Sequence, residues 1–346
     1  MLSRSILAIS TAALFAEICL AAPIDVDDSA RRSAEIVKIV REHFFDPVVA
    51  EEWAKRNANY ATGLPADQFA AATRKALAEL KVSHTGFFTE DDAKYHGLRA
   101  IFAQPLKLEK VEWESPGADF TQEGFVRRTF AGGPAEAAGL LRGDKVLQAD
   151  GASFAPVASF RGKAGKEVAL LVERREGEKA LTVKVTPRRI NPKQEWLEAQ
   201  RKGARVIKSD GKRVAYVPMF SCAGSEHQEL LEELIAQPTF REAEALIIDF
   251  RDGFGGANPQ FVNLFNKTPP VIDSKDRDGK QVIYDPQWRK PVAFLINGGT
   301  TSGKEVVAFA IRKHGIGKLI GKPTAGAVLG GRCFPLAGDC LMYLAV

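Results

Sequence analysis

The fold is decided by the stretch Val292-Ala-Phe-Leu-Ile-Asn-Gly-Gly-Thr-Thr-Ser-Gly-Lys-Glu-Val-Val-Ala-Phe-Ala-Ile-Arg-Lys-His314. It opens with an apolar run typical of a buried strand and closes with apolar residues at helical spacing. The segment between them, residues 297–305, places Ser302 where a strand hands over to a helix. A hydroxyl mounted there lies beside the first free backbone N–H groups of the helix, which favour developing negative charge. Ser302 is therefore a candidate nucleophile that needs a base and oxyanion donors from elsewhere.

A second glycine-rich turn, Asp252-Gly-Phe-Gly-Gly-Ala257, follows a buried strand that ends at Asp249-Phe-Arg251. The glycines Gly255 and Gly256 let a backbone N–H face a carbonyl oxygen without side-chain hindrance. We expect Asp249 and Arg251 to lock this turn. A tight turn without a ligand is the alternative, and a phosphate-binding loop is disfavoured because its Lys and Ser/Thr are missing.

Strand and helix patterns alternate around these two turns. The strand patterns are so apolar that helices must cover both faces of the sheet, which predicts an α/β core. The alternating segments are strands at 213–220, 244–251 and 292–296 and helices at 226–236 and 259–266.

Residues 28–82 show the periodicity of helices, with helical runs at 34–45 and 67–80, the second with Asp67 as a candidate cap. The pair Ser83-His84 follows directly, in a predicted loop. An imidazole has an unperturbed pKa of about 6.5, which suits proton transfer near neutral pH. His84 is therefore chemically suited to act as a general base; a loop histidine with ordinary hydrogen bonds is the alternative.

Residues 124–190 change to short strands separated by glycine turns. The segments Gly132-Gly-Pro-Ala-Glu-Ala-Ala-Gly-Leu140 and Arg142-Gly-Asp-Lys-Val-Leu-Gln-Ala-Asp-Gly151 resemble the helix and turn of bacterial PDZ domains. This resemblance implies a unit that takes an extended peptide as an added strand. A purely structural insert remains the alternative, because the glycine-rich loop that holds a terminal carboxylate is not visible ahead of residue 124.

Composition and charge narrow the function further. The 346 residues carry a net charge of +5 with acidic and basic residues interleaved, which gives no nucleic-acid footprint. Residues 1–21 have the charge, apolar stretch and small-residue end of a cleaved signal peptide, and no later segment is apolar enough to span a bilayer, so we expect an exported protein, periplasmic or extracellular. In that compartment a Cys333–Cys340 disulfide across a hairpin is a hypothesis, with two free buried thiols as the alternative. No cluster of His, Asp, Glu and Cys has metal-ligand spacing, so neither a metal nor another cofactor is expected.

The two glycine turns, together with Leu319-Ile-Gly-Lys-Pro-Thr-Ala-Gly326, resemble the peptidase core of the C-terminal-processing (tail-specific) serine proteases. The resemblance implies a crotonase- or Clp-like α/β core with a helical lobe and an inserted PDZ domain ahead of it. It also implies Ser302 as nucleophile, with the N–H groups of Gly303 and Gly255, or alternatively Gly256, as oxyanion donors. The corresponding divisions are 1–21 signal peptide, 22–100 helical lobe, 101–190 PDZ-like domain and 191–346 core.

The residue after the Thr-x-Gly motif separates two branches of that family. Ala327 stands where the Ser-Lys branch has its lysine, and we disfavour the nearby Lys304 and Lys322 as bases. Ser83-His84 resembles instead the serine and histidine of the tricorn-like branch, and this resemblance implies that His84 is the general base and that Ser83 orients it. Those relatives use a further glutamate beyond the hairpin that follows Thr-x-Gly, so the resemblance implies that the core is C-terminally incomplete.

The sequence therefore favours an exported serine endopeptidase that hydrolyses peptide bonds of unfolded proteins or peptides. One alternative is a catalytically inactive relative that binds peptides or acts as a scaffold. Another is acyl transfer or lyase chemistry on a non-peptide ligand, borrowed from the crotonase-like fold. The sequence leaves the oligomeric state open.

Overall fold

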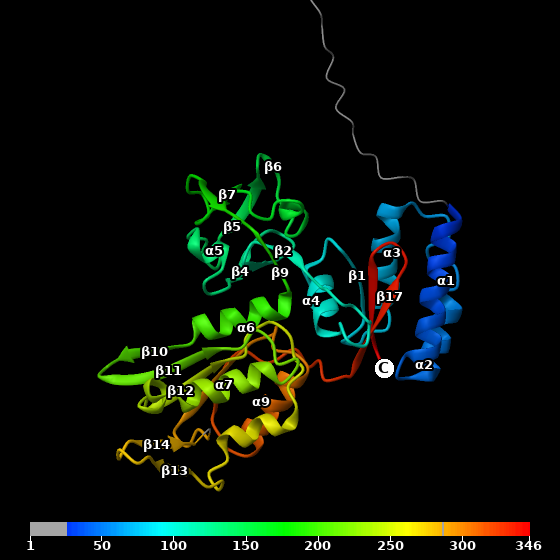
Figure 1. The fold of residues 1–346 in the computed structure, drawn as a ribbon. Helices are drawn as coiled ribbons and strands as arrows, with labels where there is room; N and C mark the ends of the chain where they lie inside the picture. Colours follow the sequence, from blue (N-terminus) through cyan, green and yellow to red (C-terminus); the bar gives the residue numbers. More distant parts are fainter. Residues whose placement is uncertain (1–25, 286) are drawn as a thin grey trace, which may run out of the picture.

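The structure is a computed structural model that describes residues 26–285 and 287–346. The predicted signal peptide lies outside these residues. Three parts follow one another through the chain: a helical lobe, a β-rich unit and an α/β core (Figure 1). In the described part of the chain, every helix is too short or too polar to cross a membrane.

The core is built on a five-stranded sheet with the order β10-β11-β12-β15-β16. Its strands are β10 (Arg205–Ser209), β11 (Lys212–Pro218), β12 (Ala245–Asp249), β15 (Val292–Ile296) and β16 (Lys318–Gly321). All neighbours pair in parallel except β10, which is an antiparallel edge strand. Every residue of β12 and β15 is buried or half-buried, as the apolar sequence of these strands predicts.

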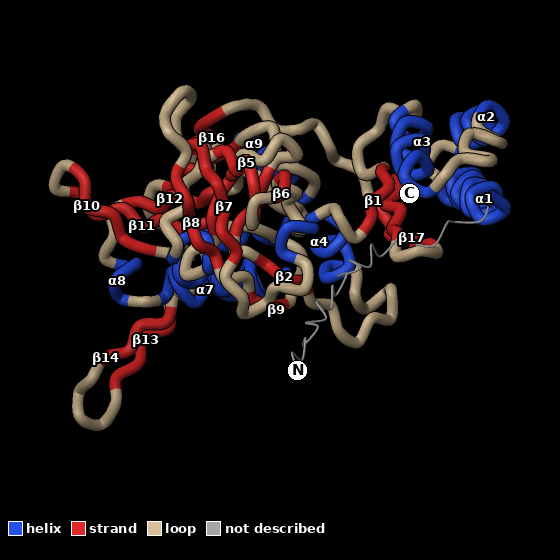
Figure 2. Tube along the Cα trace, turned by 90° about the horizontal axis from the view of Figure 1, so that it is seen from above, coloured by secondary structure: helices blue, strands red, loops and turns tan. Residues whose placement is uncertain are grey.

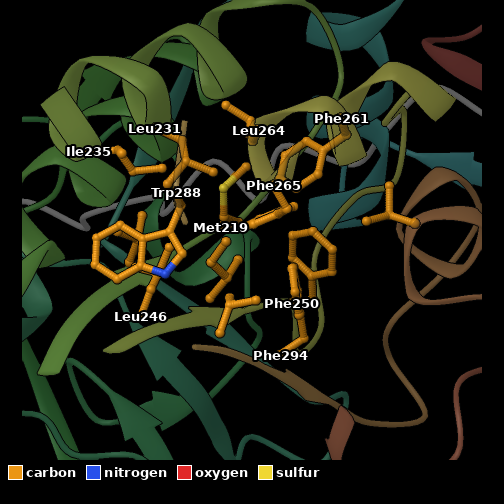
Figure 3. Packing of buried hydrophobic residues seen from close by; sticks show 14 of the residues in the cluster. Met219, Leu231, Ile235, Leu246, Phe250, Phe261, Leu264, Phe265, Trp288 and Phe294 are labelled. Atoms are coloured by element: carbon orange, nitrogen blue, oxygen red, sulfur yellow. The ribbon is translucent and has the colours of Figure 1, made fainter. Parts of the chain in front are cut away.

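Four helices and a 3-10 segment pack on this sheet. They are α6 (Pro192–Gly203), α7 (Glu226–Ala236), α8 (Pro238–Arg241), η2 (Pro259–Phe265) and α9 (Gly303–Lys313). Their apolar side chains meet those of the strands in one cluster around Phe250, whose ring centroid lies 5.6 Å from that of Phe261 and 5.3 Å from that of Phe294 (Figure 3). The hairpin of β13 (Ile272–Lys275) and β14 (Gln281–Tyr284), which the sequence patterns did not predict, projects away from the core in both views (Figures 1 and 2).

The helical lobe contains α1 (Val26–His43), α2 (Pro47–Arg56), α3 (Ala66–Ala78) and α4 (Ala93–Ile101). The indole N–H of Trp53 donates to the Ala76 carbonyl at 2.7 Å and ties α2 to α3. Helix α3 begins at Ala66 behind Pro65, so the expected cap at Asp67 is wrong: that residue lies inside the first turn. A proline there presets the φ angle for the chain to enter a helix.

The C-terminal hairpin of β17 (Gly331–Leu336) and β18 (Cys340–Ala345) packs on the helical lobe rather than on the core sheet. Strand β18 pairs antiparallel with β1 (Gly86–Thr89), and Figure 1 shows the hairpin beside α1 and α3. The expected division of the chain, which gave residues 191–346 to the core, therefore needs a correction for this segment. Its apolar residues complete a cluster that the helices of the lobe leave open on one side.

The hypothesis of a disulfide between Cys333 and Cys340 is wrong. The hairpin register pairs Cys333 with Tyr343 and Cys340 with Leu336, so the two cysteines lie on opposite faces of the hairpin. All three cysteines of the described residues are free and buried. Cys340 Sγ accepts a hydrogen bond from the Arg32 guanidinium at 3.0 Å instead.

The β-rich unit has a four-stranded sheet and two short ribbons. The sheet contains β5 (Lys145–Ala149), β6 (Ala152–Ser153), β7 (Val168–Glu173) and β8 (Leu181–Val185); the ribbons pair β2 (Trp113–Ser115) with β9 (Arg188–Ile190) and β3 (Ala118–Phe120) with β4 (Val126–Thr129). The predicted Pro-Ala helix is present as α5 (Pro134–Ala137). Between β6 and β7 lies the single 3-10 turn η1 (Ala158–Phe160).

Candidate active site

Ser302 lies between the end of β15 and the start of α9, as the sequence predicts. It is the N-cap residue of α9, with φ 56° and ψ −128°. A serine rarely adopts a positive φ, and such a conformation persists only where surrounding contacts impose it. The Ser302 N–H is held by the Ala327 carbonyl and by a Glu305 carboxylate oxygen, each at 3.0 Å. The residue is half-buried, so its hydroxyl lies at an accessible turn beside a helix N-terminus.

Glu305 is a site residue that the sequence analysis missed. Its buried carboxylate accepts from the N–H groups of Ser302, Gly326 (2.7 Å) and Ala327 (2.8 Å). It thereby clamps the Ser302 turn to the segment that follows β16. The spacing Ser302-x-x-Glu305 is the sequence signature of a capping box and could have revealed it.

The predicted oxyanion glycines lie against the nucleophile turn. A Cβ on Gly255 would stand 2.6 Å from the Ser302 Cβ, and one on Gly303 would stand 2.4 Å from backbone atoms of Ala257. Gly256 has φ +91°, and a Cβ there would meet Ala223 at 2.6 Å. The turn at 252–257 can therefore approach Ser302 this closely only because it consists largely of glycine.

The base of that turn is locked as expected. The Arg251 guanidinium donates to both carboxylate oxygens of Asp249, and the Tyr216 hydroxyl donates to the same carboxylate at 2.8 Å. Burial alone would raise the pKa of Asp249, but these donors hold it below its ordinary value. The carboxylate thus stays ionised and keeps the turn in place. Asn297 supports the other side, since its side chain binds the backbone N–H of Asp252 at 3.1 Å.

His84 lies in the loop before β1 with φ 59°. Its Nδ1 is 3.1 Å from the Ser83 hydroxyl, so the expected Ser-His contact is present. Burial and the nearby Lys94 ammonium lower the pKa of His84, while the Glu305 carboxylate acts in the opposite direction. Glu305, which clamps the Ser302 turn, is thus within electrostatic range of the imidazole. Among the hydrogen bonds of the described residues there is none between His84 and Ser302.

The disfavoured bases have other environments. Lys322 is exposed, and Ala327 contributes only its backbone to the site. Lys304 is fully buried, and its Nζ donates to the carbonyls of Met219 at 2.6 Å and Asp252 at 2.9 Å.

The remaining histidines make contacts away from Ser302. The ring of His43 stacks on Phe334 and that of His96 on Trp113, His227 is hydrogen-bonded to Gln200, and His314 ends α9.

A metal site is not visible in the described ranges, where no group of three or more His, Cys, Asp or Glu side chains is suitably arranged. The groups that the candidate site brings to a reaction are a hydroxyl at a helix N-terminus, glycine residues packed against it, and an imidazole in the loop before β1.

Comparison with known proteins bears on this site directly. Residues 213–346 match the model of peptidase family S41. The chain is 27% identical over 230 residues to a carboxyl-terminal-processing protease of Picosynechococcus sp., covering 62% of this chain and 53% of that protein. It is 24% identical over 328 residues to a tricorn protease homologue of Streptomyces coelicolor, covering 86% of this chain and 26% of the relative.

Among solved structures, the photosystem II D1 C-terminal processing protease has the same fold, with a TM-score of 0.54 and 20% identity over 92% of this chain and 87% of that one. The chain spans about half, or less, of the length of the curated relatives it matches. The comparisons therefore establish homology to carboxyl-terminal-processing proteases and a mixed α/β fold shared with them.

Proposed function

We propose that this chain, an S41 peptidase homologue through residues 213–346, is an exported serine endopeptidase that cleaves peptide bonds of unfolded proteins or peptides. The observation that carries the proposal is the contact of two turns: the strained Ser302 turn and the glycine turn at 252–257, packed so closely that Gly255 has no room for a side chain. This arrangement would present a hydroxyl and backbone N–H donors to one side of a single reacting carbonyl.

The reaction would follow the acyl-enzyme sequence. Ser302 Oγ attacks the carbonyl carbon while its proton passes to the free ring nitrogen of His84, Nε2. The N–H groups of Gly303 and Gly255, or alternatively Gly256, donate to the oxyanion, and the protonated His84 then gives its proton to the leaving amine. Water, deprotonated by His84, hydrolyses the ester on Ser302. Ser83 holds the other nitrogen, Nδ1, and thereby fixes the ring.

His84 is a better base than either lysine on physical grounds. A pKa lowered by burial keeps the imidazole neutral, and ready to accept a proton, at neutral pH. A lysine needs desolvation to serve as a base, and Lys322 is exposed. Lys304 is desolvated, but its Nζ already donates to the backbone carbonyls of Met219 and Asp252. The similarity to a tricorn protease homologue over most of the chain agrees with a Ser-His pair.

We infer further that the β-rich unit is a PDZ-like domain and that the core is crotonase-like. Helix α5 and the turn at Gly143-Asp144, whose carboxylate binds the Arg174 guanidinium and the Leu141 N–H, support the first inference. A polypeptide is the expected ligand of such a domain. Export rests on the signal-like sequence of residues 1–21.

The second candidate is an inactive relative that binds peptides without cleaving them. It is favoured by the absence, among the described residues, of a hydrogen bond between His84 and Ser302. In an apo protease such bonds are often long and tighten only with substrate, so the observation separates the two candidates less well than an experiment does.

The deciding experiment incubates the mature chain with a fluorescein-labelled unfolded protein and with internally quenched peptides. Wild type is expected to release fragments by internal cleavage, and Ser302→Ala is expected to lose at least about 1,000-fold in kcat/KM. Circular dichroism should show the same fold for both proteins. Equal turnover by wild type and Ser302→Ala would reject the peptidase proposal; binding without turnover by both would select the inactive relative.

A further inference from the structure

Among the described residues of the core, Lys304 is the one lysine with no exposed surface, and it stands two residues after Ser302 in the first turn of α9. A buried ammonium is costly unless its N–H groups find partners. Here both partners are neutral backbone carbonyls, those of Met219 at 2.6 Å and Asp252 at 2.9 Å. Its Nζ also lies 5.7 Å from the centroid of the Phe250 ring.

The two carbonyls belong to the ends of neighbouring parallel strands. Met219 follows β11, and Asp252 opens the glycine turn that follows β12. These ends are already joined by backbone hydrogen bonds, among them Met219 N–H to the Asp249 carbonyl at 3.0 Å and Phe254 N–H to the Phe220 carbonyl at 3.0 Å. Lys304 adds a connection from a third element, α9, whose N-cap is Ser302. Figure 3 shows Met219 and Phe250 within the core cluster, so one of the two acceptors belongs to a residue that is anchored in the core.

We propose that Lys304 is a positioning residue that fixes the glycine turn at 252–257 against Ser302, so that the Gly255 N–H stays aimed at the reacting carbonyl. The inference rests on the proposed function. Geometry supports it: Lys304 and Ser302 share one helical turn, and the Asp252 carbonyl lies three residues before Gly255. Any shift of α9 relative to the glycine turn would therefore have to break a buried hydrogen bond of Lys304.

The charge of Lys304 is not required for this role. Burial lowers its pKa to about 8, and a neutral amine still has two N–H groups, one for each carbonyl. The titratable and charged groups that act on Lys304, or on which it acts, are Cys222, Arg128, Asp249, Asp252 and His227. A general base must be deprotonated to act, so kcat would fall at low pH as Lys304 takes up a proton. A positioning role predicts instead that protonation of Lys304 produces no such fall in the pH profile of kcat.

The test replaces Lys304 by Met, which keeps the length of the side chain and removes both donors. Lys290→Met is the matched control, because the Lys290 ammonium also donates to backbone carbonyls, those of Arg241 and Ala243, at the opposite end of β15. Lys304→Gln, whose amide offers two donors, serves as the second variant if Lys304→Met does not fold.

Two readouts are measured at a temperature where each variant is fully folded. In peptide hydrolysis, Lys304→Met is expected to lose at least about 10-fold in kcat with little change in KM, and Lys290→Met to stay within about twofold of wild type. In hydrogen exchange without substrate, the Phe254 amide, which donates to the Phe220 carbonyl at 3.0 Å, should exchange at least about 10-fold faster in Lys304→Met only.

Exchange at Phe254 that is unchanged in Lys304→Met, or accelerated equally in Lys290→Met, would overturn the inference even if the protein is a peptidase. A wild type that cleaves no peptide would end the proposed function, while the exchange readout would still decide whether Lys304 fixes the turn. An acid limb of kcat near pH 8 in wild type that is absent from Lys304→Gln would contradict positioning and indicate an ionising role.

Discussion

The two halves of the candidate site are held in place by very different means. The nucleophile half is built from neighbouring loops of one sheet, and its turns are held by backbone N–H groups that donate to Glu305, Asn297 and Ala327. The base half is one loop of a separate lobe, where His84 has a hydrogen bond to Ser83 and a ring contact with Tyr343 at 5.5 Å. The first half is fixed by bonds within one unit, whereas the second depends on how the lobe docks.

The C-terminal hairpin connects the two halves. Ala327, which is hydrogen-bonded to Ser302 and Glu305, lies shortly before β17, and the chain returns in β18, which pairs with β1, the strand that follows His84. Gly331 has no room for a side chain because a Cβ would meet the Tyr343 ring at 2.3 Å. Docking of the lobe is therefore coupled to the segment that supports the nucleophile. Variants in either half can be used to test the difference between the two halves.

The largest effect is expected from the base half. His84→Gln removes the proton acceptor, and we expect kcat/KM for peptide hydrolysis to fall by about 100- to 10,000-fold. Lys322→Ala is the control and should stay within about twofold. A loss of kcat/KM in Lys322→Ala as large as the loss in His84→Gln would show that the base has been assigned to the wrong half of the site.

The next largest effect is expected from a substitution that disrupts the nucleophile half. Gly255→Ala introduces a methyl group 2.6 Å from the Ser302 Cβ, so the glycine turn must move and its N–H must leave the proposed oxyanion position. We expect a loss of about 100-fold in kcat. Gly298→Ala, in the loop before Ser302, adds a methyl group that meets nothing within 4 Å and should leave kcat unchanged. Similar rates for the two alanine variants would show that the close contact has no catalytic role.

A smaller effect tests which groups set the pKa of the imidazole in the base half. Because burial and Lys94 both lower the pKa of His84, the acid limb of kcat/KM should lie below pH 6.5, where protonation removes the base. Lys94→Gln removes one of the two causes, so the limb should move to higher pH by less than about one unit. A limb that stays in place, or moves to lower pH, would exclude an influence of Lys94 on the base.

The smallest effect on turnover is expected at Glu195, which lies in α6 with its carboxylate fully buried and a guanidinium nitrogen of Arg188 3.7 Å away. Burial raises the pKa of Glu195 to about 7. The buried acid is stable while protonated, so its contribution is complete below about pH 4.5 and is lost as the pH rises through 7. The amide that replaces the acid in Glu195→Gln cannot ionise. Between pH 4.5 and 8 the free energy of unfolding should therefore fall less in this variant than in wild type, by at most about 3 kcal/mol.

Chemical denaturation at several pH values measures this difference. Peptide hydrolysis at pH 7 should change less than twofold, because Glu195 touches neither half of the site. An unfolding free energy that depends on pH as strongly in Glu195→Gln as in wild type would contradict the raised pKa.

The nucleophile half could be predicted from the sequence because its parts are short and local. The strand 292–296, the turn at Ser302 and the helix after it lie where the pattern places them, and Asp249 and Arg251 lock the glycine turn as expected. Glu305 was missed although its capping-box spacing was visible. The burial of Lys304 could not be predicted, because its acceptors are carbonyls from segments far away in the sequence.

The base half could be predicted from the sequence only in part. The pair Ser83-His84 was identified by residue type and position, but the pairing of β18 with β1 depends on which lobe offers an open apolar surface, and no local pattern encodes that. The disulfide hypothesis failed for a related reason. A register that pairs Cys333 with Tyr343 is set by the length of the turn and by packing on the lobe, not by the spacing of the cysteines.

The central claim is that the imidazole of His84 activates the hydroxyl of Ser302. The most direct measurement is the second-order rate at which a fluorophosphonate labels Ser302 in wild type, His84→Gln and Lys322→Met, with the labelled residue identified by mass spectrometry. We predict labelling at least about 100-fold slower in His84→Gln and unchanged in Lys322→Met. Equal rates in wild type and His84→Gln, both folded, would contradict the claim.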